Sequence, residues 1–247
     1  EPAKADADNK EAAKTLAPVK VIGTQGERVQ GYKAETTRLG RMKQELKDVP
    51  QAVSVVTHDL MAEQGAANLK DVLKNVSGIT FAAGEGGRSG DQVILRGFAA
   101  FNDMYRDGQR DVAQYNRDPF NDEKIEVLKG ASSMLFGRGS TGGVINQVSK
   151  APFAGELLGA DLTIGTNHYQ RITLDVNKPY SDTTAVRLNV MGTDDGSPNG
   201  KSKSKRWGVA PSVAFGLGEP TTLVLSHHHL TEKNRPDLGV PYDPNTL

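Results

Sequence analysis

The stretch Gly137–Gly142 is the first place where residue types and spacing suggest chemistry. Its sequence, Gly-Arg-Gly-Ser-Thr-Gly, fits the G-x-G-x-x-G pattern of dinucleotide-binding loops. Such a loop needs a strand before it and a helix after it, because the N-terminus of that helix holds the pyrophosphate. Here Val144–Val148 predicts a strand after the glycines. The pattern therefore gives little support to nucleotide binding.

The histidine run from His227 to His229 invites a metal-binding interpretation. Neighbouring residues of a strand point to opposite faces, so at most His227 and His229 share one, and an interfacial aromatic belt is the better interpretation. His58, Ser132 and Ser133 show no spacing typical of a catalytic triad. The sequence has no cysteine, which excludes disulfides, thiolate metal sites and cysteine nucleophiles. Nothing in the residues indicates catalysis, so we expect no enzyme activity and no metal site.

Charge and hydropathy narrow the class of protein. Lys plus Arg and Asp plus Glu each total 30 among 247 residues, so the formal net charge is zero and gives no electrostatic argument for nucleic acid as a partner. No apolar run approaches the roughly 18 residues of a membrane helix, and residues 1–6 do not resemble a signal peptide. The protein is either soluble, or has lost its signal peptide and crosses a membrane with β-strands, which a mean hydropathy of −0.49 allows.

The N-terminal part of the chain predicts two different segments. Residues 1–14 contain charges and alanines but no large apolar residue, so we expect a mobile leader. Residues 15–24 follow, in which Pro18 disfavours a helix and Val19 and Val21 share one face of an extended chain. This segment could add as a strand to the open sheet edge of a partner, or could be a linker.

Residues 40–150 predict a compact α/β unit. Strands are expected at 51–57, 93–95 and 125–128, and the Asp107-Gly108 pair is typical of a hairpin turn. Leu69, Val72, Leu73 and Val76 recur at helical spacing and predict a short helix that Gly78 ends. Polar, Gly-rich loops are expected at 82–91 and 111–119.

Residues 155–247 change to strict alternation and predict about five antiparallel strands of membrane-barrel length. A half-buried sheet of a soluble protein gives the same alternation. Arg171, Asp175 and Arg187 lie on one face, opposite an aliphatic face, and this favours the membrane interpretation. Five strands would leave two open edges, so we expect the sequence to be incomplete.

Three stretches resemble the plug domain of TonB-dependent outer-membrane receptors. They are, in order, Val93–Phe98, Ile125–Gly139 and Gly142–Lys150. Val19, Lys20, Val21 and Ile22 fall where that family carries its TonB box. The resemblance spans residues 16–244 and implies a fold: a plug with a small mixed sheet and short helices, inside a transmembrane antiparallel barrel of about 22 strands, of which this chain has the first five or so.

Within that family the chain looks most like siderophore receptors, in particular the ferric-catecholate group. The stretches that carry this likeness are 103–108, 110–111, 116–118, 234–237 and 239–242. The resemblance implies uptake of a ferric siderophore across the bacterial outer membrane, driven by TonB and its inner-membrane energising complex. The expected partners are TonB, the ferric siderophore and outer-membrane lipid. No permanently bound cofactor is expected, because the iron arrives already wrapped by its siderophore.

Candidate site residues come from the same resemblance. A bulky anionic cargo needs donors and aromatic faces at the plug apex, and the candidates are Arg88, Phe101, Asn102, Gln114, Tyr115 and Arg117. A second set is expected to lock the plug to barrel carboxylates that this chain lacks, because buried charges need partners: Arg96, Glu126 and Lys129. The alternatives are a receptor for another cargo, such as a copper complex or a vitamin, and a soluble plug-like interaction module.

Overall fold

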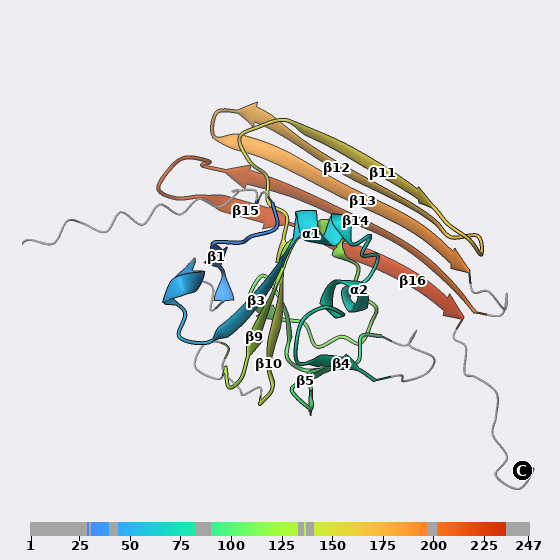
Figure 1. Cartoon of the computed structure of the whole chain (residues 1–247). Coiled ribbons are helices and arrows are strands. Elements are labelled where there is room, and N and C mark those ends of the chain that lie inside the picture. Colours follow the sequence, from blue (N-terminus) through green and yellow to red (C-terminus); the bar gives the residue numbers. More distant parts are fainter. Residues whose placement is uncertain are drawn as a thin grey trace, which may run out of the picture.

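The protein consists of a small α/β body that lies against the concave face of a curved antiparallel sheet (Figure 1). The computed structural model describes residues 29, 31–39, 44–82, 90–132, 136, 141–196 and 202–235. The name α/β body is used for the described residues up to Lys150, and strand wall for the sheet after it. The expected TonB box at Val19–Ile22 lies outside the described residues.

The α/β body is built on a mixed sheet with the strand order β3-β9-β10-β7-β8. β9 pairs antiparallel with β3 and with β10, whereas β10 pairs parallel with β7. A smaller sheet joins β4, β5 and β6, and β1 pairs with β2. The strands are β1 (Thr36–Thr37), β2 (Gln44–Glu45), β3 (Ala52–Thr57), β4 (Ile79–Phe81), β5 (Val93–Leu95), β6 (Phe98–Ala99), β7 (Met104–Arg106), β8 (Gln109–Arg110), β9 (Asp122–Lys129) and β10 (Gly143–Ser149).

The helical elements of the body whose bounds are described are two short helices and two 3-10 turns. They are α1 (His58–Glu63), α2 (Leu69–Leu73), η2 (Leu46–Asp48) and η4 (Pro119–Asn121). Asn68 caps α2 by accepting from the Asp71 N–H, and Leu69, Val72 and Leu73 are buried, as the spacing predicts. The helix ends at Leu73, earlier than expected. Val76 follows in a turn but still packs on the same core.

The predicted strands at 51–57, 93–95 and 125–128 are confirmed as β3, β5 and part of β9. The predicted strand after the glycine run is β10. The Asp107-Gly108 turn is also confirmed, with φ angles of 50° and 74° that the hairpin between β7 and β8 requires. Helix α1, for which the sequence analysis gave no expectation, follows β3 directly and begins at the cap Thr57.

The strand wall confirms the predicted alternation. Its strands pair in chain order up to β14, which pairs with β15 along one half and with β16 along the other, so β15 and β16 form one broken fifth strand. The bounds are β11 (Leu157–Ile164), β12 (Gln170–Ser181), β13 (Thr184–Gly196), β14 (Lys203–Phe215), β15 (Leu223–Ser226) and β16 (His229–Arg235). β12 to β14 have 12 or 13 residues, enough for a tilted membrane strand.

The two faces of the wall differ in chemistry. The face turned away from the body carries large exposed apolar side chains: Leu158, Leu162, Ile164, Ile172, Tyr180, Val186, Leu188, Trp207, Phe215, Leu223 and Leu225. The face turned toward the body carries the polar residues Arg171, Asp175, Arg187 and Arg206. No helix among the described residues is long and apolar enough to cross a membrane.

Candidate functional site

The loop from Asp111 to Arg117, called here the apical loop, lies at one end of the α/β body and touches the last strand of the wall. The amide of Asn116 donates to both carboxylate oxygens of Glu232 in β16, at 3.0 and 3.2 Å. At its far end the loop is joined to α2, because the Leu69 N–H donates to the Arg117 carbonyl. The loop is therefore fixed between a helix of the body and the wall.

The apical loop is organised around the buried guanidinium of Arg117, whose side chain is 2% exposed. It donates to the Asp111 carboxylate, with Nη2 at 3.0 Å, and lies 3.5 Å from Asp91. It also donates to the carbonyls of Asp111 and Ala113, and the Tyr115 ring stacks 4.4 Å from it. Tyr115 closes the cluster by donating to Asp111 at 2.7 Å. One cation thus contacts two carboxylates and satisfies two loop carbonyls.

Gly90 lies close against the apical loop. Its φ is +117°, and a Cβ at this position would lie 2.7 Å from Gln114 Cγ and 3.0 Å from the Tyr115 backbone nitrogen. Only glycine accommodates both conditions without displacing the neighbours. The next residue, Asp91, donates its N–H to the Tyr115 carbonyl and accepts from the Arg117 N–H. Gly90 and Asp91 are therefore held directly against the apical loop.

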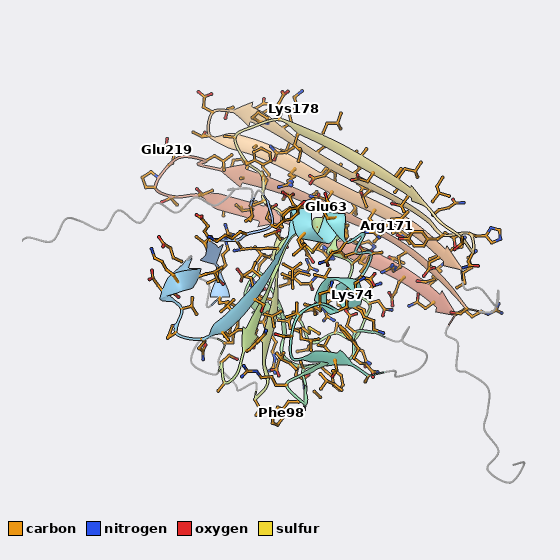
Figure 2. The ribbon with its side chains drawn as sticks, viewed as in Figure 1. Glu63, Lys74, Phe98, Arg171, Lys178 and Glu219 are labelled. Atoms are coloured by element: carbon orange, nitrogen blue, oxygen red, sulfur yellow. The ribbon has the colours of Figure 1, made fainter. Side chains whose placement is uncertain are left out.

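Asp118, directly after the apical loop, is the main ionic contact between the body and the wall. It is 1% exposed, and its carboxylate accepts hydrogen bonds from both terminal nitrogens of Arg171 in β12, at 2.6 and 2.7 Å. Arg206 from β14 lies 3.4 Å from the same carboxylate. Figure 2 shows Arg171 where the side chains of the body meet the wall. Two wall arginines therefore share one carboxylate of the body.

A second ionic group joins the end of β10 to the wall. Lys150 lies 3.0 Å from Asp175, which also receives two hydrogen bonds from Arg187 at 2.8 and 2.9 Å. Arg187 also lies 3.9 Å from Glu123 of β9. Burial lowers the pKa of the Lys150 ammonium, and the Asp175 carboxylate partly offsets that effect. The group holds the chain where it passes from the body into the wall.

Phe120 supplies the apolar part of the contact. Its ring is 6% exposed and packs with Met191 and Ala210 of the wall. It also stacks on His228 with ring centroids 5.4 Å apart. Gly208 leaves room for this ring, because a Cβ there would lie 2.9 Å from two ring carbons. Residues 116–123 of the body thus meet the wall through a hydrogen bond, ion pairs and one aromatic ring.

Comparison with known proteins identifies the body. Residues 45–144 match the family model of the TonB-dependent receptor plug domain. The chain carries a TonB-dependent receptor plug domain. In sequence it is 46% identical to the catecholate siderophore receptor Fiu of Escherichia coli K12 over 199 residues, which are 78% of this chain and 26% of Fiu. It is 38% identical over 240 residues to the probable TonB-dependent siderophore receptor PiuA of Acinetobacter baumannii, covering 96% of this chain and 32% of PiuA.

The fold comparison includes the wall as well as the plug. The closed-form crystal structure of Fiu superposes with a TM-score of 0.80 and 42% identity, over 85% of this chain and 30% of that chain. The strand wall therefore corresponds to antiparallel barrel strands of such a receptor. The chain spans only 26% to 32% of the length of these relatives, and its five strands do not close a barrel.

Of the residues expected to bind the ligand, several are exposed and one is buried. Phe101 is 44% exposed, and Asn102 and Gln114 are exposed as well, while Tyr115 is half-buried. Arg117 differs from the expectation: its guanidinium points into the loop and is occupied by Asp91 and Asp111, so it holds the loop together. Arg88 lies outside the described residues. The ligand contacts themselves stay predictions.

The residues expected to lock the plug take different positions. Glu126 is fully buried within the plug, where it binds Lys124 at 2.8 Å and Asn146 at 3.1 Å. Lys129 donates to Ser77 at 2.8 Å, and Arg96 is exposed with a φ of 53°. The pairing of Arg96, Glu126 and Lys129 with barrel carboxylates outside this chain stays a prediction. Contacts with the described wall include those of Asp118, Phe120 and Lys150, which the sequence analysis did not single out.

No group of three or more His, Asp or Glu side chains suited to a metal ion occurs among the described residues. His227 and His229 share one face of the wall, as alternation predicts, with their rings stacked and their centroids 6.5 Å apart. Trp207 lies 4.9 Å from the His229 ring. The arrangement is an aromatic group on the outer face. His228 points the other way, onto Phe120.

The Asp91 carboxyl should make the stability of the apical loop depend on pH. Burial raises its pKa to about 6, although Arg117 opposes the shift. Because this folded-state value lies above the ordinary 3.8, the folded loop binds more protons between these values, and its stability falls as pH rises from about 4 to 6. Hydrogen exchange of residues 111–117 should therefore show lower protection factors at pH 7 than at pH 5. Asp91→Asn should abolish that difference, and an equal difference in the variant would contradict the assignment.

Proposed function

We propose that the full-length protein is a TonB-dependent receptor that takes up a ferric siderophore of the catecholate class across the bacterial outer membrane. One observation carries the proposal: a plug domain packed on barrel strands whose sequence is 46% identical to a catecholate siderophore receptor. The fold places a polar, partly exposed apex at one end of the wall, and the outward face of the wall is apolar, as a lipid-facing barrel requires.

The apex has the chemistry that such a cargo needs. A ferric catecholate complex is bulky, anionic and rich in aromatic rings, so it is recognised by ring stacking and by donors. Phe101 and Tyr115 offer rings, and Asn102 and Gln114 offer amide donors, all at least partly exposed. Burial raises the pKa of the Tyr115 phenol to about 12, so this side chain stays neutral and adds no negative charge at the apex. These residues and Arg88 form the proposed ligand surface.

Energy for uptake would come from TonB, which would pair with residues 19–22 as an added strand and pull on the plug. The cargo class is tested by iron uptake into cells that lack their own siderophore receptors and express the full-length protein. Ferric catecholate should be taken up, and ferric hydroxamate, copper complexes and vitamins should not. Uptake of a different cargo alone would overturn the catecholate assignment and leave the receptor fold intact.

Replacing Val21 with Pro should separate binding from transport. Proline removes a backbone donor from the edge that would pair with TonB, while the apex is unchanged. Uptake of the ferric siderophore should fall to the level of cells without TonB, and binding to isolated outer membranes should stay the same. Ala12→Pro in the leader is the matched control and should transport normally. Normal uptake by the Val21 variant would contradict the role of this segment.

A further inference from the structure

The outward face of the wall carries an unusual cluster of positive charge at the end near the plug apex. Lys203 and Lys205 of β14 face outward, as do Lys233 and Arg235 of β16. The register pairs Lys205 with Lys233 and Lys203 with Arg235. Side chains directly opposite each other on one face lie about 5 Å apart, and like charges in such pairs are destabilising. This arrangement costs free energy unless an anion lies among the four cations.

The wall itself supplies only part of the compensating charge. Asp194 of β13 binds Lys205 at 2.8 Å and Lys203 at 3.2 Å. Among the described residues, no ion pair is present for Lys233 or Arg235. Within the described part of the wall, the cluster holds four positive charges and one negative charge. Lys203 and Lys205 are also about half exposed, so the cluster is open to a ligand from outside the protein.

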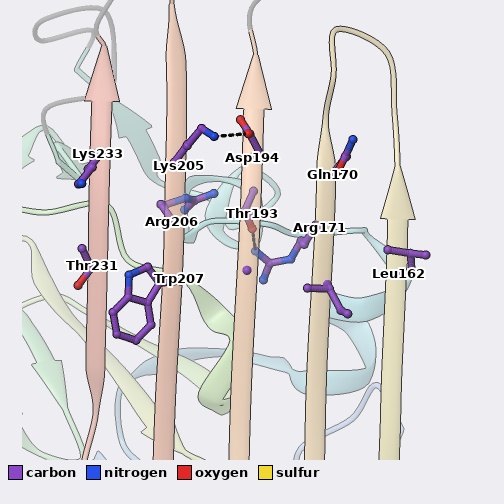
Figure 3. A pocket seen from close by; sticks show the side chains of 12 residues that line it. Leu162, Gln170, Arg171, Thr193, Asp194, Lys205, Arg206, Trp207, Thr231 and Lys233 are labelled. Carbon is purple, nitrogen blue, oxygen red and sulfur yellow. Dashed lines mark hydrogen bonds and ion pairs between the residues drawn. The ribbon is translucent and has the colours of Figure 1, made fainter.

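A shallow groove of about 570 Å³ lies directly beside this cluster (Figure 3). The register aligns five of its residues in one row across the wall, in the order Leu162, Ile172, Gly192, Trp207, Thr231. The next row, two residues or about 6–7 Å along the strands, contains Gln170, Asp194, Lys205 and Lys233. The side chains of Leu162, Ile172 and Trp207 are each more than half exposed.

Gly192 makes this row a groove. It lies between Ile172 and Trp207 and contributes no side chain to the outward face. An apolar channel about one strand wide therefore leads from the cationic row onto the apolar outer face of the wall. A chain of methylene groups fits such a channel, and a free inorganic ion would gain nothing from it.

We propose that this groove binds one phosphorylated lipid of the membrane. The phosphate group lies between Lys205 and Lys233, with Lys203 and Arg235 beside it, and an acyl chain lies over Gly192 between Ile172 and Trp207. Clusters of basic residues at a membrane surface attract anionic lipid head groups, and a Trp ring at the same depth marks the interface. Given the proposed function, the end of the wall beside the apical loop lies at the outer surface of the cell. The lipid therefore belongs to the outer leaflet and carries its phosphate on a glycolipid head group.

The test is lipid binding to the full-length receptor purified in detergent, followed by native mass spectrometry. The probes are bis-phosphorylated lipid A, its fully dephosphorylated form, phosphatidylethanolamine and inorganic phosphate. The receptor should retain lipid A, and Lys205→Gln with Lys233→Gln should weaken this binding about tenfold or more. Lys178→Gln is the matched control, because Lys178 is an exposed, outward-facing lysine at the other end of the wall (Figure 2). It should bind lipid A as the unchanged receptor does.

A second variant tests the groove without changing charge. Gly192→Leu fills the channel, and its Cβ would lie 3.4 Å from Ile172, an ordinary contact, so the strand should fold. Binding of lipid A should weaken while the charge cluster stays intact. Equal binding of the dephosphorylated lipid, or of inorganic phosphate alone, would overturn the proposal, as would unchanged binding by both variants. Siderophore binding is measured on the same preparations. A failure of the lipid proposal can then be told apart from a failure of the proposed siderophore function.

Discussion

Asp118→Asn should loosen the plug from the strand wall by about 3–5 kcal/mol, the usual cost of removing one partner from a buried ion pair. The change leaves the guanidiniums of Arg171 and Arg206 at the interface without their shared carboxylate. The Asn side chain still offers an oxygen to the Phe120 N–H, so the turn η4 should keep its cap. Hydrogen exchange of plug amides in the full-length receptor should therefore rise at residues 116–123 before it rises elsewhere.

Two comparisons make the Asp118 result specific. Asp182→Asn removes an exposed carboxylate from the turn between β12 and β13 and should change exchange little. Combining Asp118→Asn with Arg171→Gln should destabilise the plug by less than the sum of the two single changes. The double variant no longer leaves a buried Arg171 charge without a partner. A change in plug stability of less than about 1 kcal/mol for Asp118→Asn alone would contradict this role. Solvent would then reach the Asp118–Arg171 ion pair, and other residues would hold the plug to the wall.

The periodicity of the sequence predicted much of the fold for local reasons. Strands β3, β5 and β9 and helix α2 follow from the spacing of their own apolar residues. The turn at Asp107 follows from the two residues that must adopt positive φ. The inward face of the wall followed from alternation, since Arg171, Asp175 and Arg187 share a parity. Each of these features depends on residues within about ten positions of one another.

The contacts between plug and wall could not be predicted in this way. Asp118 and Arg171 are 53 positions apart, and Asn116 and Glu232 are 116 apart, so no local spacing relates them. Three basic and acidic residues on the inward face of the wall indicated that partners must exist, but not which residues supplied them. The parallel pairing of β7 with β10 is equally non-local. An excess of charge on a face that must be buried was the one available signal.

The apical loop shows why residue type alone misassigned one side chain. Arg117 resembles a ligand donor in sequence, because an arginine beside polar residues in a loop is usually exposed. Its burial depends on the close approach that Gly90 permits and on Asp91, which lies 26 positions earlier. The sequence analysis had no means to bring these segments together. Arg117 is therefore better described as a residue that positions Tyr115.

Arg117→Met should disorganise the apical loop and lower the affinity for the ferric siderophore more than tenfold. Methionine has a similar length but no charge, so Asp91 and Asp111 lose their shared cation and two loop carbonyls lose their donors. Leaving buried carboxylates without a cation costs about 3–5 kcal/mol. This is enough to open a loop that is fixed by few other contacts. The affinity is measured on the full-length receptor in outer membranes. Lys74→Met, at an exposed lysine at the end of α2, is the control and should bind normally.

The pH dependence of the Arg117 variant distinguishes a positioning role from a direct contact with the cargo. Without the guanidinium, burial acts unopposed on Asp91, and the pKa of that carboxyl should rise above its value of about 6. At pH 5 the Asp91 carboxyl is then protonated, its own uncompensated charge disappears, and part of the loop order and of the affinity should recover. An arginine that touched the siderophore itself would not be replaced by a proton on Asp91. Affinity that stays low at pH 5, with a loop still protected from exchange, would therefore assign Arg117 to the ligand.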